Sequence, residues 1–385
     1  MGKHDFEFQA DKAITAEAHQ DFMTLYWQDG GVSRFHYQWL RDNCRSTERF
    51  DPATQERKAL TESIPCKLNA REISVAGTEI RINWSDGSAD SSFDAHWLKR
   101  NAYDMDETSS KAPQQFWGSD YGSSLESFAY DDIMSNDDAS ATMIAAFEAF
   151  GLVRLTDMPT TDREVERFAN RLSYVREIAF DRVADIRVSV DPYTLGFTNA
   201  ALPLHTDCSG YSWPPNVMAF HCLHNDVAGG ASQYVDGANV VSQLRQTNPE
   251  ALRIMTDYAV EFRLWSKKAD TMSMYPPVIL DERGELALLR YANWTVQPLK
   301  TVPFDLVPDW YDAWRALAER VNAPENRVSY RCSPGEMLLI NNHRVLHGRD
   351  AFDDGQGLRH FQQVYLELDD LSGFRRIVQG EGGAK

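Results

Sequence analysis

Cysteine is scarce in this sequence, with five residues among 385 and no CxxC pair. They are Cys44, Cys66, Cys208, Cys222 and Cys332. Scattered cysteines in an odd number argue against a disulfide framework and are typical of a protein kept reduced inside the cell. Residues 1–6 contain no apolar segment of the kind found in secretion signals. We therefore expect a cytoplasmic protein.

Positive charge is also scarce, because 39 Lys and Arg residues face 57 Asp and Glu residues and leave a formal net charge of −18. Such a chain is repelled by a phosphate backbone and by an anionic membrane surface. No apolar run approaches the roughly 20 residues that span a bilayer. We expect no nucleic-acid partner and no membrane partner, and a small molecule as the ligand. A local arginine can still attract an anionic ligand into a pocket.

Aromatic residues are plentiful, with 10 Trp, 15 Tyr and 19 Phe, and 385 residues exceed what one hydrophobic core usually supports. We expect a small β-rich N-terminal domain over residues 1–105, a linker over 106–124 and a larger domain over 125–385. In the small domain, apolar alternation on both sides of residues 76–78 predicts a hairpin, and a strand is expected from Phe35 to Leu40. The linker segment is poor in aliphatic residues and rich in Ser, Asp and Gln.

The larger domain combines many short strands with a few helices. Asp137 or Asp138 can cap a helix whose apolar residues recur up to Phe150, and Gly151 can end it before a buried strand. Further helices are predicted over 162–174, 237–246 and 310–321, and closing strands over 337–340 and 361–368. This pattern indicates a mainly β fold with flanking helices, a double-sheet jelly roll that holds its ligand between the sheets.

Two distant motifs carry the chemistry, Leu204-His205-Thr206-Asp207 and the segment 341–349. In an extended segment, side chains two residues apart point to the same side, so His205 and Asp207 can reach one ion. His347 supplies a third ligand. Two histidines and one carboxylate on one face of an ion form the facial triad of non-haem Fe(II) oxygenases, which leaves open positions for cosubstrate and dioxygen. An HxD pair alone is weak evidence, and it gains weight from His347 and from Arg359, twelve residues further on.

A larger set of segments extends the match. They are 202–207, Trp213-Pro214-Pro215, 221–224, 229–237, 342–349 and Arg359, together with Trp39-Leu40-Arg41-Asp42-Asn43-Cys44 near the N-terminus. In this order and spacing the chain resembles the γ-butyrobetaine dioxygenase family within the TauD-like Fe(II)/2-oxoglutarate-dependent oxygenases. The resemblance implies a double-stranded β-helix catalytic domain, a homodimer, and iron held by His205, Asp207 and His347. The carboxylate ligand Asp207 favours hydroxylation over halogenation.

The resemblance also implies a site for 2-oxoglutarate, the cosubstrate that is decarboxylated to succinate. Arg359 can grip its far carboxylate in a bidentate fork, and Ser232 occupies the family position of a hydroxyl that donates to the same group. The alternative for Arg359 is a surface ion pair, which the spacing from His347 disfavours. His343 and the pair His221 and His224 are better explained as structural histidines, because strand geometry points His221 and His224 to opposite faces.

Substrate residues follow from the same resemblance. Aromatic faces hold a trimethylammonium group by cation–π attraction, and the family positions of such a cage fall on Phe180, Phe197 and Tyr365. The cage tryptophan of the family aligns with Ala184, which leaves the cage incomplete, and core packing is an equal explanation for these aromatics. Arg290 and Asn293 lie where the family binds the anionic end of its substrate.

The first domain departs from the family at its zinc site. Three cysteines and a distant histidine form that site in the family, but here only Cys44 is kept, while Ser46 and Arg49 occupy the neighbouring region. A closed structural zinc site needs four strong ligands. We expect no structural zinc.

Taken together, these features predict an Fe(II)- and 2-oxoglutarate-dependent dioxygenase that hydroxylates γ-butyrobetaine to carnitine. The alternative substrates are 2-(trimethylammonio)ethylphosphonate and trimethyllysine. Two alternatives come from other classes: a zinc hydrolase centred on His221 and His224, and a catalytically inactive binding protein.

Overall fold

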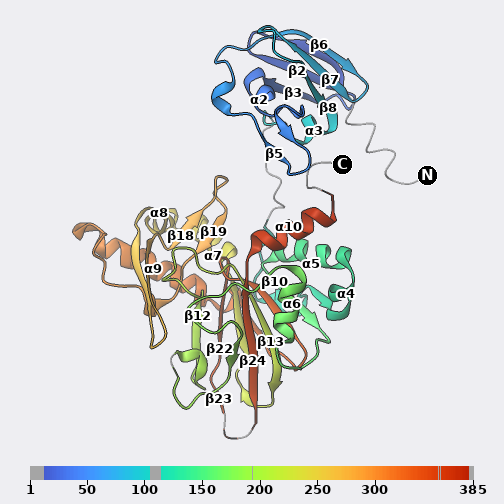
Figure 1. The fold of residues 1–385 in the computed structure, drawn as a ribbon. Helices are drawn as coiled ribbons and strands as arrows, with labels where there is room; N and C mark the ends of the chain where they lie inside the picture. Colours follow the sequence, from blue (N-terminus) through green and yellow to red (C-terminus); the bar gives the residue numbers. More distant parts are fainter. Residues whose placement is uncertain (1–12, 105–113, 193, 354, 356, 381–385) are drawn as a thin grey trace. The chain divides into compact units, whose positions relative to one another are not determined.

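The computed structural model describes residues 13–104, 114–192, 194–353, 355 and 357–380 (Figure 1). The chain divides near residue 111 into two compact units. None of the described helices is long and apolar enough to cross a membrane.

The first unit is built from two three-stranded antiparallel sheets around one core. One sheet holds β1 (Ala13–Ala18), β2 (Phe22–Trp27) and β3 (Val32–His36), and the other holds β6 (Ala70–Ala76), β7 (Glu79–Trp84) and β8 (Ser91–Asp94). The predicted hairpin is β6–β7. Along β7 the buried residues Ile80, Ile82 and Trp84 alternate with more exposed ones, so one face of the sheet covers the core.

Two helices, α2 (Tyr37–Asp42) and α3 (Ala95–Arg100), and the short pair β4 (Phe50–Asp51) and β5 (Glu56–Arg57) complete this unit. The strand expected from Phe35 to Leu40 is wrong beyond His36, where α2 begins. Tyr37, Leu40 and Arg41 are its buried residues, at the spacing of one helical face. A short apolar run does not distinguish a strand from one helical turn, which explains the error.

The second unit is a jelly roll of two facing sheets. The larger sheet has the order β11-β24-β13-β21-β10-β9 and the smaller one β12-β22-β15-β20. Their bounds are β9 (Ser127–Ala129), β10 (Leu152–Thr156), β11 (Ala184–Ile186), β12 (Leu202–His205), β13 (Val217–Asn225), β15 (Ser232–Asp236), β20 (Arg327–Tyr330), β21 (Met337–Asn341), β22 (Val345–Arg349) and β24 (Arg359–Leu366). All pairs are antiparallel except β9 with β10.

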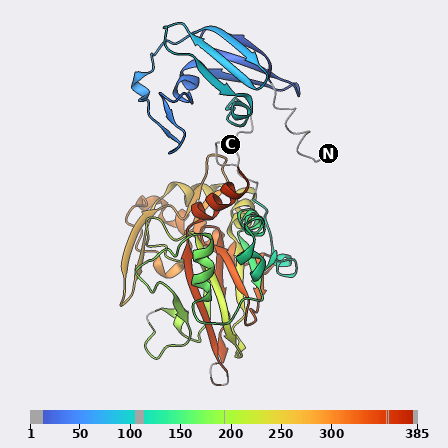
Figure 2. The same cartoon turned by 45° about the vertical axis from the view of Figure 1, so that its right-hand side comes forward.

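Alternation along β21 shows why the larger sheet is buried on both faces. Met337 and Leu339 pack with residues of the covering helices, whereas Leu338 and Ile340 pack in a second cluster with residues of the smaller sheet. The covering helices are α4 (Tyr130–Ser135), α5 (Asp137–Phe150), α6 (Glu164–Leu172) and α10 (Leu368–Val378), which lie on one side of the large sheet (Figures 1 and 2). The space between the two sheets is therefore where a ligand can enter.

A further apolar cluster forms beside the smaller sheet around α7 (Gly237–Thr247), α8 (Pro249–Asp257) and α9 (Val307–Asn322). Two hairpins and one pair of distant strands complete the unit. The hairpins are β16 (Val260–Trp265) with β17 (Asp270–Tyr275) and β18 (Val278–Leu280) with β19 (Leu286–Leu289), and the distant strands are β14 (Ala228–Gly229) and β23 (Phe352–Asp353). Helices α8 and α10 were not predicted. The cap of α5 is Asn136 and not Asp137 or Asp138, because its side chain accepts from two N–H groups of the first turn, and Gly151 with φ 72° ends the helix as expected.

Of the linker predicted over 106–124, residues 106–113 lie outside the described residues, and the segment from Gln114 onward belongs to the second unit. Trp117 is buried, and its indole N–H donates to the carbonyl of Phe150 at 2.8 Å. The Tyr121 hydroxyl donates to the carbonyl of Leu152 at 2.9 Å. Trp117 and Tyr121 thus anchor this polar segment in the core of the second unit.

Candidate active site

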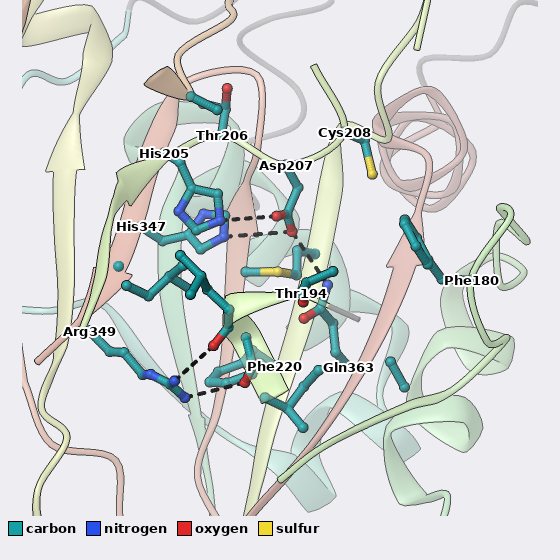
Figure 3. A pocket seen from close by; sticks show the side chains of 18 of the residues that line it. Phe180, Thr194, His205, Thr206, Asp207, Cys208, Phe220, His347, Arg349 and Gln363 are labelled. Carbon is teal, nitrogen blue, oxygen red and sulfur yellow. Dashed lines mark hydrogen bonds and ion pairs between the residues drawn. The ribbon is translucent and has the colours of Figure 1, made fainter. Parts of the chain in front are cut away.

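Strand register brings the three predicted ligands together. His205, at the end of β12, is the direct antiparallel partner of His347 on β22. The Asp207 carboxylate faces both rings from one side, with Oδ1 at 3.2 Å from His205 Nε2 and Oδ2 at 3.6 Å from His347 Nε2 (Figure 3). Among the described residues these three are the only group of three or more side chains that can share a metal ion, with ligand atoms within 4.8 Å of one another.

Thr206 separates the two ligands and points the other way. Its hydroxyl donates to the Leu289 carbonyl at 3.1 Å and accepts from the Tyr291 N–H at 3.0 Å. Asn342 fixes the next residue: its side-chain oxygen accepts from the Asp207 N–H at 2.6 Å, and its amide nitrogen donates to the Asp207 carbonyl at 3.1 Å. The backbone on both sides of the Asp207 carboxylate is therefore held in place.

Hydrogen bonding prepares His205 as a ligand. Its Nδ1 lies 2.9 Å from the Pro203 carbonyl, which can only accept, so Nδ1 carries the proton and Nε2 offers its lone pair toward Asp207. Burial raises the pKa of Asp207, but His347 and His205 outweigh it and hold that pKa well below its usual range. Burial and then His205 lower the pKa of His347. Two imidazoles and one carboxylate form the donor set that suits Fe(II).

The triad opens into a cavity of about 430 Å³. The cavity is lined by the three predicted ligands, by Arg359 and Ser232, and by all three predicted cage aromatics, Phe180, Phe197 and Tyr365. Ala184 also lines it. Residues from the larger sheet, the smaller sheet and the loops between them thus share one space.

Two buried arginines line this cavity, and their surroundings differ. The Nη2 of Arg349 donates to three backbone carbonyls, those of Leu195, Thr198 and Ala200. Arg359 is 4 % exposed and stacks over Phe361 at 4.3 Å, and its Nε and Nη1 have no hydrogen-bond partner among the described residues. A buried guanidinium with unused donors fits an absent carboxylate ligand, so the surface ion pair considered for Arg359 is excluded.

Tyr365 both lines the cavity and contacts a predicted metal ligand. Its ring lines the cavity, and its hydroxyl donates to Asp207 Oδ2 at 2.7 Å. Burial, and next the charge of Asp207, raise the pKa of Tyr365 well above its usual value, so the phenol keeps its proton and remains a donor. This contact with the carboxylate was not predicted from the sequence.

Arg290 and Asn293 do not line the cavity, in contrast to the expectation. Arg290 is buried, with Nη2 donating to the Ser212 carbonyl at 2.7 Å and its guanidinium over the Tyr275 ring at 4.2 Å. Asn293 is exposed, and its side-chain oxygen accepts from Trp314 Nε1 at 2.9 Å. Trp294 lines the cavity instead, with its ring centroid 5.1 Å from that of His205. Asn293 and Trp294 belong to one 3₁₀ turn, and the sequence alone does not show which of the two side chains points into the cavity.

The histidines considered for a zinc hydrolase do not form a metal site. His221 is fully buried and His224 is exposed, and a β-bulge between Cys222 and His224 breaks the alternation that the sequence predicted for this strand. Neither histidine belongs to a metal-ligating group of described residues. His343 is also structural, with Nε2 2.8 Å from the Pro214 carbonyl.

A jelly roll that presents two histidines and one aspartate to a cavity with a free buried arginine defines the class of Fe(II)- and 2-oxoglutarate-dependent dioxygenases. The family model of the taurine catabolism dioxygenase TauD, TfdA family matches residues 109–365. The chain belongs to this family. A second family model, gamma-butyrobetaine hydroxylase-like, N-terminal, matches residues 14–99.

Characterised relatives cover almost the whole chain. The γ-butyrobetaine dioxygenase of Pseudomonas sp. (strain AK-1) is 32% identical over 354 residues, which are 91% of either chain. The mitochondrial trimethyllysine dioxygenase of Mus musculus is 28% identical and covers 94% of this chain and 87% of its own. Among solved structures, a taurine dioxygenase from Burkholderia xenovorans aligns with 15% identity and a TM-score of 0.49, over 66% of this chain and 90% of its own.

Proposed function

We propose that this dioxygenase hydroxylates a small trimethylammonium compound, with γ-butyrobetaine as the first candidate. The observation that carries the proposal is one cavity lined by the metal ligands, by Arg359 with its unused donors, and by Phe180, Phe197 and Tyr365. The 32% identity to a γ-butyrobetaine dioxygenase over 91% of the chain supports the substrate class.

His205, Asp207 and His347 would hold the iron. When bound, Fe(II) would supply the oxidising chemistry, in which 2-oxoglutarate, O₂ and the substrate become succinate, CO₂ and the hydroxylated product. Arg359 and Ser232 would bind the far carboxylate of 2-oxoglutarate, which places its reactive end toward the triad. The buried apolar walls of the cavity keep bulk water away from the reacting centre.

Phe180, Phe197 and Tyr365 offer ring faces to a quaternary ammonium group, which cannot donate a hydrogen bond and is recognised by aromatic faces. Ala184 leaves space beside them. The alternative of a catalytically inactive binding protein is disfavoured, because all three metal ligands are present and Arg359 has unused donors for a cosubstrate.

Trimethyllysine is the second candidate, since trimethyllysine dioxygenases also align over more than nine-tenths of the chain. 2-(Trimethylammonio)ethylphosphonate is the third. We rank it below the other two, because the relatives that align over most of the chain are dioxygenases of γ-butyrobetaine and trimethyllysine.

The test incubates the protein with Fe(II), 2-oxoglutarate and O₂ and with each of the three compounds, and measures succinate and a product heavier by one oxygen. We expect both from γ-butyrobetaine. An Asp207→Ala variant should give neither and serves as the control. Succinate formation without any substrate dependence would contradict the proposed substrate class, and absence of succinate throughout would contradict the proposed activity.

We also propose that the enzyme is a homodimer located in the cytoplasm. The family resemblance supports the first statement. The second is supported by the described cysteines, none of which forms a disulfide. Light scattering on the purified protein measures the oligomeric state.

A further inference from the structure

The hairpin β16–β17 reaches the cavity from outside the two sheets. Leu264 and Trp265, the last residues of β16, line the cavity, and the turn 266–269 follows them directly. No sequence motif pointed to this hairpin, because its residues lie far along the chain from both metal-ligand segments. Its position raises the question of what holds it there.

The body of the hairpin is fixed to the loop that follows Asp207. The Ser273 hydroxyl donates to the Ser209 carbonyl at 2.8 Å. Gly210 packs so closely that a Cβ atom would lie 2.5 Å from the Thr271 carbonyl oxygen and 2.7 Å from the Leu264 nitrogen. Any side chain at position 210 would push the hairpin away. The strands are thus anchored as far as the pair Leu264 and Thr271, and residues 265–270 extend beyond this anchor.

The tip is held by two ion pairs to the opposite wall. Lys267 pairs with Asp191, and Lys268 Nζ lies 2.9 Å from Asp181 Oδ2. Asp181 itself lines the cavity, next to Phe180. All four side chains are at least 40% exposed, so the pairs are weakened by salt and contribute little to folding. Such contacts can hold a tip in place and still release it.

The side chain of Trp265, at the tip, is an indole that is exposed and not packed in the core. Trp265 is 72% exposed and lines the cavity, as does Trp294, which is 45% exposed. An exposed indole face is the strongest cation–π partner among the side chains. Neither tryptophan belongs to the predicted cage.

We propose that Trp265 is a substrate-contacting, specificity-determining residue, and that the Lys267–Asp191 and Lys268–Asp181 pairs hold it over the cavity when a trimethylammonium substrate is bound. This inference rests on the proposed function. It assigns the hairpin tip as the outer wall of the substrate site, opposite the cage residues that surround the metal ligands.

The first experiment compares Trp265→Ala and Trp265→Phe with wild type. The Ala variant should raise the KM for γ-butyrobetaine about two- to fivefold, the range expected for one cation–π contact, while the Phe variant recovers part of the loss. The KM for 2-oxoglutarate should not change. Trp213→Ala is the matched control, since Trp213 is 54% exposed but packs edge-to-face with His343 and does not line the cavity. Calorimetric binding of γ-butyrobetaine without O₂ should show the same order of affinities.

The second experiment tests the ion pairs. Lys267→Ala with Lys268→Ala should raise the substrate KM and remove its dependence on ionic strength. The control is Arg263→Ala with Asp270→Ala, which removes an exposed ion pair of 2.7 Å within the same hairpin that does not cross the cavity. In hydrogen exchange, substrate should protect amides 265–270 in wild type and in the control but not in the double-lysine variant.

Equal KM values in the Trp265 and Trp213 variants would overturn the assignment of Trp265, and equal behaviour of the two ion-pair variants would overturn the role of the lysines. In both cases wild type would still form succinate with a trimethylammonium substrate. If wild type formed no succinate with any compound, the proposed function would fail first, and the two failures are thereby distinguished.

Discussion

Asn342 hydrogen-bonds both the N–H and the carbonyl of Asp207, at 2.6 and 3.1 Å, from the turn that leads into β22. The same amide nitrogen donates to the Pro215 carbonyl at 2.8 Å. Asn342 is 1% exposed, and it stands five residues before His347. The Asn342 side chain therefore joins the loop that carries Asp207 to the strand that carries His347. The distance between these two predicted ligands depends on this contact.

Asn342→Ala should weaken metal binding about 10- to 100-fold, the usual effect of removing a group that orients a ligand. The measurement is Fe(II) or Co(II) affinity by calorimetry without O₂, together with thermal unfolding. Asn326→Ala is the control, because Asn326 is 2% exposed and donates to the Arg320 carbonyl at 2.9 Å, far from the ligands in the fold. Both variants should lose about 1–3 kcal/mol of stability, and only the first should lose metal affinity. Equal metal affinities would reduce Asn342 to a structural role.

Arg359→Lys should raise the KM for 2-oxoglutarate about 10- to 100-fold, since an ammonium group keeps the charge but loses the bidentate fork, and a charged hydrogen bond contributes about 1.5–3 kcal/mol. Thermal stability should change little, because Nε and Nη1 of Arg359 bind no described residue. Arg349→Lys should behave in the opposite way, because that guanidinium is committed to backbone carbonyls between Leu195 and Ala200. Steady-state kinetics and unfolding on both variants check the contrast, which a shared rise in KM would contradict.

The sequence was sufficient for the features that depend on local order. The HxD alternation, the distance from His347 to Arg359 and the apolar runs of β10 and β21 follow from periods of two and from motif spacing. The antiparallel register of His205 with His347 completed the triad that these motifs predicted. Local patterns were also enough to place the two hairpin strands β6 and β7.

Features that depend on tertiary contacts were missed. The sequence indicates Asn293, but the structure turns its neighbour Trp294 to the cavity, because a 3₁₀ turn has no simple alternation. Trp265 reaches the cavity through a hairpin whose packing depends on Gly210. The polar composition of residues 106–124 predicts a linker, whereas the residues that Trp117 and Tyr121 contact lie elsewhere in the chain.

His221 should make stability fall in acid. Burial lowers the pKa of this fully buried histidine to about 4, against 6.5 for an exposed one. Between pH 6.5 and 4 this histidine is protonated in the unfolded chain but neutral in the folded protein. The free energy of unfolding therefore falls as the pH drops through this range, by on the order of 3 kcal/mol in all.

Urea unfolding of His221→Leu at several pH values should show a shallower decline than wild type. It should not be flat, because burial also lowers the pKa of His343 to about 4. His224→Leu, which alters an exposed histidine on the same strand, is the control and should keep the wild-type slope. An unchanged slope in His221→Leu would show that His221 is protonated in the folded state.

The buried pair Arg344 and Asp236 should be strongly coupled. Nε and Nη2 of Arg344 donate to the two carboxylate oxygens at 2.8 and 2.9 Å, and the side chains are 3% and 0% exposed. Arg344→Met leaves the buried Asp236 carboxylate without its partner and should lower the free energy of unfolding by about 3–5 kcal/mol. Asp236→Leu should cost a similar amount, because it also removes the cap of α7 at the Ala238 N–H.

A double-mutant cycle by urea unfolding separates pairing from packing. Arg344→Met with Asp236→Leu should cost clearly less than the sum of the single changes, since the second substitution removes the charge that the first leaves unpaired. The exposed pair Arg253 and Asp257 on α8, 48% and 49% exposed, is the control and should show coupling below about 1 kcal/mol. Additive costs at Arg344 and Asp236 would mean that water reaches the pair. In that case the pair would contribute little to the position of β22, which begins at Val345 and carries His347.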